Sequence, residues 1–156
     1  MPDYSQKSIK KKKGRYNTGI HISPKSNMPI KYRSGWEKYA CLWFDSDPNV
    51  VEYFYEQIKI PYVANIKTNK VRIYYPDFFV VYKSGEKKII EVKRQNQINN
   101  IKIQKKTNGA ILWCQKNQMI FEFLTDPKIK ELIKLFPNQF PKKKKRSIKK
   151  LGKIVK

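Results

Sequence analysis

Residues 74–93 read YYPDFFVVYKSGEKKIIEVK, and this stretch decides the expected fold. The runs 71–82 and 87–94 are rich in β-branched and aromatic residues, which favour strands. Between them, Ser84-Gly85 is typical of a tight turn. The stretch therefore predicts a β-hairpin.

The predicted hairpin carries charged side chains in apolar surroundings. Glu91 and Lys93 are two positions apart on one strand, so both point to the same face. With a turn of two to four residues, Asp77 falls opposite Glu91 to within about two positions. Pro76 permits a bend that aims Asp77 at the same point. Charges inside apolar strands are costly unless they are paired, so we expect these three side chains to meet.

Two carboxylates and one ammonium group at one place suggest two alternatives. The first is a site for a hard divalent ion, because Mg²⁺ prefers oxygen ligands and retains several waters. Water bound to such an ion is a better nucleophile, and Lys93 would orient it and offset charge developing on a phosphate. The second alternative is an internal salt bridge between Lys93 and either Asp77 or Glu91.

Patterns outside the hairpin predict a mixed α/β domain. Ser34-Gly-Trp-Glu37 is typical of a capping box, in which the Glu37 carboxylate accepts from the Ser34 N–H. An apolar helical stripe follows it. The members of this stripe are Trp36, Tyr39, Ala40 and Trp43.

Further elements are expected along the chain. Residues 50–55 predict a strand, and 56–62 continue extended, with Pro61 indicating an edge or a break. Residues 96–115 favour a helix interrupted at Thr107-Asn-Gly109, and 119–124 a strand. A last helix is expected to have Asp126 as its cap, Pro127 at its first position and Pro137 after its end.

The charge is the first indication of a partner. Lys and Arg number 35 against 12 Asp and Glu, a formal net charge of +23. Such a chain repels itself unless a polyanion neutralises it, so nucleic acid is the expected partner and an anionic membrane surface the second. We expect a basic arm at 1–16, a folded domain at 17–141 and a basic tail at 142–156. The tail residues expected to bind DNA are Lys142, Lys143, Lys144, Lys145 and Arg146.

Several classes of protein are disfavoured. No apolar run is long enough to span a membrane, and none follows the basic N-terminal residues as in a signal peptide, so we expect neither a membrane nor a secreted protein. The single histidine, His21, and the cysteines Cys41 and Cys114 do not form a zinc site or a nucleophilic set.

The motifs of the chain resemble the PD-(D/E)xK nuclease signature and, more specifically, the head-completion nuclease family of tailed phages, which is related to TnsA-type endonucleases. The resemblance covers about residues 29–125 and not the tails. It depends on Tyr32-Arg-Ser-Gly-Trp-Glu37, Asp47-Pro48, Glu56 with Ile60-Pro-Tyr62, Arg72 with Tyr75-Pro-Asp77-Phe78, and Ile90-Glu-Val-Lys93.

The resemblance implies a restriction-endonuclease-like α/β core, with a mixed central sheet and flanking helices. It implies Asp77, Glu91 and Glu37 as metal ligands and Lys93 as the catalytic lysine. The implied ion is Mg²⁺, with Mn²⁺ able to substitute. Glu56 also matches a family acid, although pairing with a nearby lysine is an equal alternative. After Lys93 the chain departs from the family, which often has proline and a clean helix there.

The function that follows is a Mg²⁺-dependent DNA endonuclease of a phage, which processes DNA ends during head completion. The implied partners are DNA and portal or neck proteins, and the implied location is the host cytoplasm and the virion. Arg33 and Arg72 precede site elements and would hold phosphates, unless they are ordinary surface arginines. The alternatives are a non-catalytic structural DNA-binding protein of the virion head, a Holliday-junction resolvase and a transposition endonuclease.

Overall fold

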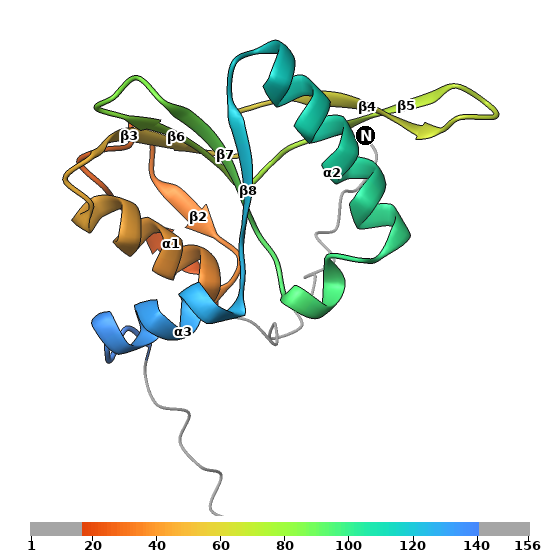
Figure 1. Ribbon diagram of the computed structural model, residues 1–156. Helices are drawn as coiled ribbons and strands as arrows, with labels where there is room; N and C mark the ends of the chain where they lie inside the picture. Colours follow the sequence, from red (N-terminus) through yellow and green to blue (C-terminus); the bar gives the residue numbers. More distant parts are fainter. Residues whose placement is uncertain (1–16, 141–156) are drawn as a thin grey trace, which may run out of the picture.

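The computed structural model describes residues 17–140, so the two basic tails lie outside the described residues, as do Lys142, Lys143, Lys144, Lys145 and Arg146. The described residues form strands and three α-helices (Figure 1). Their order is β1 (Gly19–His21), β2 (Ile30–Tyr32), α1 (Gly35–Ser46), β3 (Val50–Tyr55), β4 (Ile60–Asn65), β5 (Lys70–Tyr74), β6 (Phe78–Tyr82), β7 (Lys87–Val92), a 3₁₀ turn (Gln95–Gln97), α2 (Ile101–Lys116), β8 (Ile120–Leu124) and α3 (Asp126–Leu135). None of the helices at 17–140 is long and apolar enough to cross a membrane.

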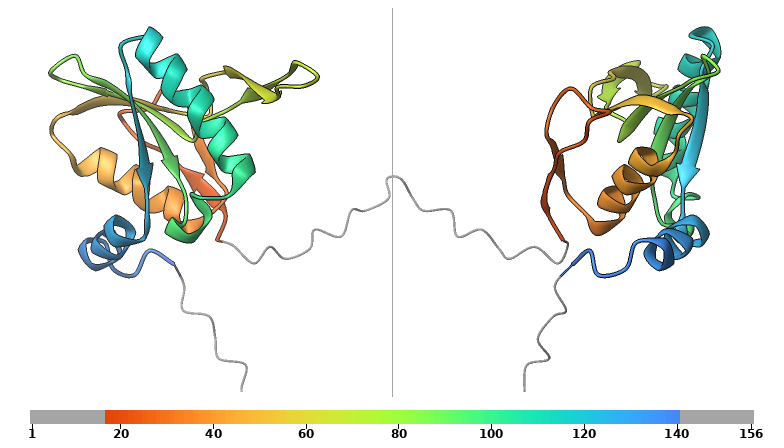
Figure 2. Two further views of the ribbon diagram at one scale, coloured as in Figure 1. Left: turned by 45° about the vertical axis from the view of Figure 1, so that its right-hand side comes forward. Right: turned by 90° about the vertical axis from the view of Figure 1, so that its left-hand side faces the viewer.

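The central sheet has four strands in the order β3-β6-β7-β8. The pairs β3–β6 and β6–β7 are antiparallel, whereas β7–β8 is parallel because α2 returns the chain to the same end of the sheet. Helices α1 and α3 pack together beside one face of the sheet, and α2 contacts β8 and β4 (Figures 1 and 2). The expected restriction-endonuclease-like α/β core, with a mixed central sheet and flanking helices, is therefore confirmed.

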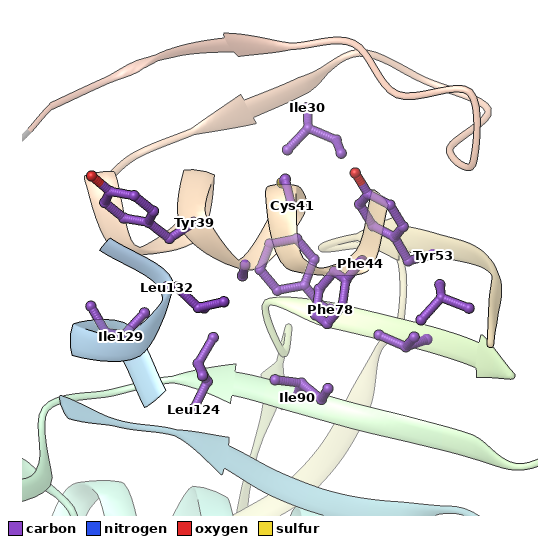
Figure 3. Close-up of a cluster of buried hydrophobic side chains, with 13 residues drawn as sticks. Ile30, Tyr39, Cys41, Phe44, Tyr53, Phe78, Ile90, Leu124, Ile129 and Leu132 are labelled. Atoms are coloured by element: carbon purple, nitrogen blue, oxygen red, sulfur yellow. The ribbon is translucent and has the colours of Figure 1, made fainter. Parts of the chain in front are cut away.

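The main core lies between the sheet and helices α1 and α3 (Figure 3). Phe44 of α1 packs against Phe78 of β6 and Tyr53 of β3, with ring centroids 5.2 and 5.1 Å apart. Leu132 of α3 is fully buried in the same cluster. Burying a large apolar side chain is worth about 1.5–3 kcal/mol, so this cluster holds β6 in place, and β6 begins directly after Asp77.

The apolar stripe predicted on α1 is only half right. Tyr39 and Ala40 are buried as expected, together with Phe44, but Trp36 and Trp43 are only partly buried. The two indoles lie at the edge of the core, where Arg94 and Lys128 sit over them at 5.2 and 4.7 Å from their centroids.

The extended runs 56–62 and 71–82 are each divided by a break. Strand β3 ends at Tyr55, and Glu56 has a φ of 52°, a left-handed conformation that turns the chain out of the sheet. The second run divides at Pro76, which has no N–H for a ladder bond. As a result β5 pairs with β4 in a separate two-stranded ribbon, while β6 remains in the central sheet.

Helix α2 is continuous from Ile101 to Lys116, so the expected interruption at Thr107-Asn-Gly109 is wrong. Gly109 is needed for packing rather than for a break. A Cβ placed there would lie 2.5 Å from the Cβ of Tyr62 on β4. The glycine therefore lets the helix approach the β4–β5 ribbon closely.

The substitution Gly109→Ala should destabilise the protein by about 1–3 kcal/mol, although alanine is the better helix former. The added methyl group forces α2 away from Tyr62. The measurement is thermal or denaturant unfolding, with Asn108→Ala as the control, because Asn108 is exposed on the same helix. Stability equal to or above wild type in Gly109→Ala would contradict this packing account.

The start of α3 differs from its prediction by one residue. Thr125 is the N-cap, and Asp126 is the first helical residue, followed by Pro127. The Asp126 carboxylate instead accepts a hydrogen bond from the backbone N–H of Gln95 at 2.8 Å. Asp126 thus ties α3 to the segment that follows Lys93.

Candidate active site

The β6–β7 register brings the two predicted carboxylates together. Phe78 pairs with Ile90, so the next position along the ladder sets Asp77 opposite Glu91. Each carboxylate accepts a hydrogen bond from the backbone of the opposite strand: Asp77 N–H donates to Glu91 Oε2 at 3.1 Å, and the N–H of Val92, next to Glu91, donates to Asp77 Oδ2 at 2.8 Å. These reciprocal bonds hold both carboxylates at one end of the hairpin.

Lys93 lies beside this pair. Its Nζ is 4.0 Å from Glu91 Oε1, and its backbone N–H donates to the Leu124 carbonyl at 3.0 Å. That backbone bond prolongs the parallel β7–β8 pairing, so β8 fixes where the lysine leaves the sheet. The expectation that one face of the hairpin brings together Asp77, Glu91 and Lys93 agrees with this geometry.

The carboxylate pair is electrostatically unfavourable without a cation. Burial raises the pKa of Asp77 well above its ordinary value, and the charges of Glu91 and Glu37 raise it further. Burial likewise raises the pKa of Glu91, against the opposing effects of Tyr74, the Asp77 N–H and Lys93. Bound positive charge would relieve this repulsion.

Glu37 is buried in the first turn of α1, and its charge acts on Asp77. The predicted capping box is half right: Glu37 N–H donates to Ser34 Oγ at 3.3 Å, as expected. The Glu37 carboxylate, however, accepts from the Arg33 N–H at 2.6 Å and from the Tyr55 hydroxyl at 2.9 Å, not from the Ser34 N–H. These bonds fix the Glu37 carboxylate between the start of α1 and the end of β3.

Glu56 also lies at the site, because its N–H donates to the Asp77 carbonyl at 2.9 Å. Its carboxylate forms an ion pair with Arg33 rather than with a lysine. The Arg33 side chain is 69% exposed, so its remaining donors face solvent beside the carboxylates. Arg72 lies elsewhere, on β5 opposite Tyr62 in the separate ribbon.

Two tyrosines of the site were not predicted from the sequence. Tyr55 donates to Glu37, and Tyr74, which is buried, bonds Glu91 and opposes the rise in its pKa. Each is the last residue of its strand, and neither strand shows a regular alternation of buried and exposed residues, so the sequence offered no clear signal for either tyrosine.

The remaining sequence candidates have structural roles. His21 Nε2 bonds Asp45 Oδ2 at 2.7 Å, which fastens β1 to the end of α1. Burial raises the pKa of the Cys41 thiol to about 12 and that of Cys114 to about 11, so neither is an activated nucleophile.

The donor set fits a divalent cation held by few protein ligands. Within residues 17–140, no group of three or more His, Cys, Asp and Glu side chains is arranged to hold a metal ion. Mg²⁺ does not require such a cage, because one or two carboxylates and several waters suffice. Asp77 and Glu91 supply two carboxylates whose mutual repulsion a cation removes. Glu37, bonded to Arg33 and Tyr55, would act through its charge or through a water.

A cavity of about 520 Å³ opens next to Lys93. Its lining includes Ser34 and Gly35 at the start of α1, Trp36, and the cation Arg94. This cavity has room for a segment of a polar, negatively charged ligand beside the ammonium group of Lys93.

The sequence comparisons agree with this arrangement. A family model described as the N-terminal domain of TnsA-like endonucleases matches residues 47–126, about half of the chain. The protein belongs to this family of endonuclease domains. The expected kinship with TnsA-type endonucleases is thus confirmed.

A particular relative is also similar. The chain is 35% identical over 68 residues to the head completion nuclease of Enterobacteria phage T4. The match covers 44% of this chain and 45% of that protein, so the chain spans about half the length of the curated relative it matches. The expected resemblance to head-completion nucleases is confirmed.

Proposed function

We propose that the protein is a metal-dependent DNA endonuclease that hydrolyses phosphodiester bonds with Mg²⁺, or with Mn²⁺ in its place. The observation that carries the proposal is the pair of buried carboxylates, Asp77 and Glu91, bracketed by reciprocal backbone bonds next to Lys93. Their residue types and order match the site implied by the nuclease resemblance.

The roles of the side chains follow from their positions. Asp77 and Glu91 would hold the ion, and Glu37 would add negative charge on the α1 side. The bound ion supplies Lewis acidity and lowers the pKa of its water. Lys93 lies close enough to orient the attacking water and to offset charge on the phosphate. Arg33, exposed beside the site, would contact a neighbouring phosphate.

We also propose that the protein acts on phage DNA ends during head completion, in the host cytoplasm or in the virion, together with portal or neck proteins. The support is the similarity of a 68-residue segment to the head completion nuclease of phage T4. The core has no separate domain for reading bases within residues 17–140, so recognition of DNA shape or of an end is favoured over recognition of sequence.

The test is cleavage of linear, supercoiled and four-way DNA with Mg²⁺, Mn²⁺ or EDTA. The proposal expects cutting of linear or supercoiled DNA that EDTA abolishes. Paired nicks confined to the four-way substrate would show a Holliday-junction resolvase instead. Binding without cutting on every substrate would show a structural DNA-binding protein of the virion head.

The basic tail at 142–156 carries nine Lys or Arg and no acid. Its removal should weaken DNA affinity and reduce the salt dependence of binding while the metal-dependent site remains intact. The measurement is DNA affinity over a series of salt concentrations, for the full chain and for a chain ending at residue 141. Equal affinity and equal salt dependence would instead give the tail another role, such as docking to a protein.

A further inference from the structure

The excess of positive over negative charge in the described domain comes from two segments. Segments 57–76 and 92–121 together carry ten Lys or Arg and no Asp or Glu. The other residues of 17–140 carry ten Lys or Arg and eleven Asp or Glu. The excess charge of the described domain therefore lies entirely in these two segments, which we call the basic wing.

The two segments of the basic wing form one structural unit. The first contains the β4–β5 ribbon and the second contains α2, and the two pack together through Tyr62, Ala110 and the close approach at Gly109. Lys105 Nζ also donates to the Ala64 carbonyl at 3.2 Å. In Figure 1 the ribbon and α2 lie side by side, and the ribbon projects beyond the central sheet.

The basic wing begins at the candidate site. Its first segment lies between Glu56 and Asp77, whose backbones are joined by a hydrogen bond of 2.9 Å. Its second segment follows directly after Glu91. Lys106 of α2 lies over the ring of Tyr74 at 5.9 Å from the centroid, so cationic side chains of the wing extend up to the carboxylates.

The cations of the basic wing are free to meet an outside partner. Within residues 17–140, only Lys93 of the ten lies within 4.0 Å of a carboxylate. Eight of the ten are exposed, and Lys93 and Lys106 are half-buried. The exposed members are Lys59, Lys67, Lys70, Arg72, Arg94, Lys102, Lys105 and Lys116. Elsewhere in residues 17–140, three of the ten Lys and Arg have acidic partners, namely Arg33, Lys88 and Lys128, so the wing differs from the rest chiefly in having no Asp or Glu of its own.

We propose that the basic wing, formed by the β4–β5 ribbon and α2, is the surface on which the folded domain holds the sugar-phosphate backbone of DNA beside the active site. The inference rests on the proposed nuclease function and identifies the surface that presents the substrate. Duplex DNA carries about one charge per 1.7 Å of axis, so it suits a surface of exposed cations that has no carboxylates of its own and adjoins the site. Lysine contacts phosphates as a point charge, so the wing binds without reading sequence.

Two matched quadruple variants of the full chain test this surface. The wing variant is Lys67→Gln, Lys70→Gln, Lys102→Gln, Lys116→Gln, and the control variant is Lys83→Gln, Lys87→Gln, Lys130→Gln, Lys134→Gln. All eight lysines are exposed, and each variant removes the same four charges. Binding of a labelled 20-bp duplex is measured in EDTA by fluorescence anisotropy over several salt concentrations, after unfolding curves show that both variants are folded.

The wing variant should bind about tenfold or more weakly at 100 mM salt, and the slope of log K against log salt should become shallower by about three to four. The control variant should stay within about threefold of wild type. Equal weakening in both variants would overturn the proposal, because binding would then follow net charge alone. Unchanged DNA binding in both variants would also overturn the proposal. If the wing variant bound DNA like the control but bound vesicles of anionic lipid more weakly than the control, the wing would instead be a membrane-binding surface.

Because binding is measured without metal, the result is independent of catalysis. If the wing variant binds DNA more weakly than the control but no metal supports cleavage, the DNA-binding surface is retained and the nuclease function is rejected. If the protein cleaves DNA but the two variants bind it equally, the nuclease function is retained and this surface is rejected.

Discussion

Asp77→Asn is expected to lower the rate of DNA cleavage by at least about 100-fold, because it removes a direct ligand of the proposed ion. The fold should survive, since the asparagine oxygen can still accept the Val92 N–H that now bonds Asp77 Oδ2. The thermal stability of the metal-free protein should be equal or higher, because the substitution ends the repulsion between Asp77 and Glu91. Cleavage rates and melting curves in EDTA are the two measurements.

The control for Asp77→Asn is Glu52→Gln, which removes one negative charge from an exposed position of the same sheet. It should cleave within about threefold of wild type. If Asp77→Asn kept wild-type cleavage, the carboxylate pair would be only a partner of Lys93 in an internal salt bridge, as the alternative interpretation of the sequence allows.

Lys93→Met is expected to reduce cleavage by about 10²–10⁴-fold, the usual contribution of a positioned proton-transfer group. Methionine keeps the length and the apolar stem of lysine but loses the ammonium group 4.0 Å from Glu91. Affinity for the ion should be retained, because Lys93 is not a proposed ligand. Loss of its positive charge near the cation should, if anything, increase that affinity. Single-turnover cleavage at saturating metal separates this chemical defect from a defect in metal binding.

Lys87→Met serves as the control for Lys93→Met, because Lys87 is an exposed lysine at the start of β7, the strand after which Lys93 follows directly. Wild-type rates in Lys93→Met would reject a role for this lysine in the reaction. A loss of cleavage that disappeared at high metal concentration would show that Lys93 instead helps to assemble the ion site.

The central part of the site could be predicted from the sequence because it depends on local rules. Ser84-Gly85 fixes the turn of the hairpin, and alternation then fixes which side chains share a face. These rules place Asp77 opposite Glu91 to within about two positions, and the observed register, continued by one position, sets the two directly opposite. Strands and helices were also expected close to their observed ranges wherever β-branched runs or caps marked them, as at Val50–Tyr55.

Features that depend on distant contacts could not be predicted. Pro76 marks the point where the run 71–82 divides, but nothing local shows that β5 pairs with β4 instead of continuing in the central sheet. Gly109 lies in a sequence typical of a helix interruption. Its close approach to Tyr62 on β4, which shows why a glycine is needed inside a continuous helix, is visible only in the structure. The bond from Tyr55 to Glu37 joins β3 to α1, and it replaces half of an otherwise regular capping box.

The net charge of the chain was evident from composition, whereas its arrangement in the folded domain required the structure. Segments 57–76 and 92–121 are separated by the strands that carry Asp77 and Glu91. Packing of the β4–β5 ribbon on α2 brings these segments together on one side of the site. The fold thus separates cations that can bind a polyanion from the carboxylates that would bind a metal.

The most direct test of the account is a calorimetric titration of Mn²⁺ into the wild-type protein, Asp77→Asn, Glu91→Gln and Lys93→Met. We expect saturable binding at the carboxylate pair in the wild type and in Lys93→Met. Binding at this site should be lost, or weakened by at least about tenfold, in Asp77→Asn and in Glu91→Gln. Absence of binding in the wild type, or equal binding in all four proteins, would contradict a metal-dependent nuclease site at Asp77 and Glu91.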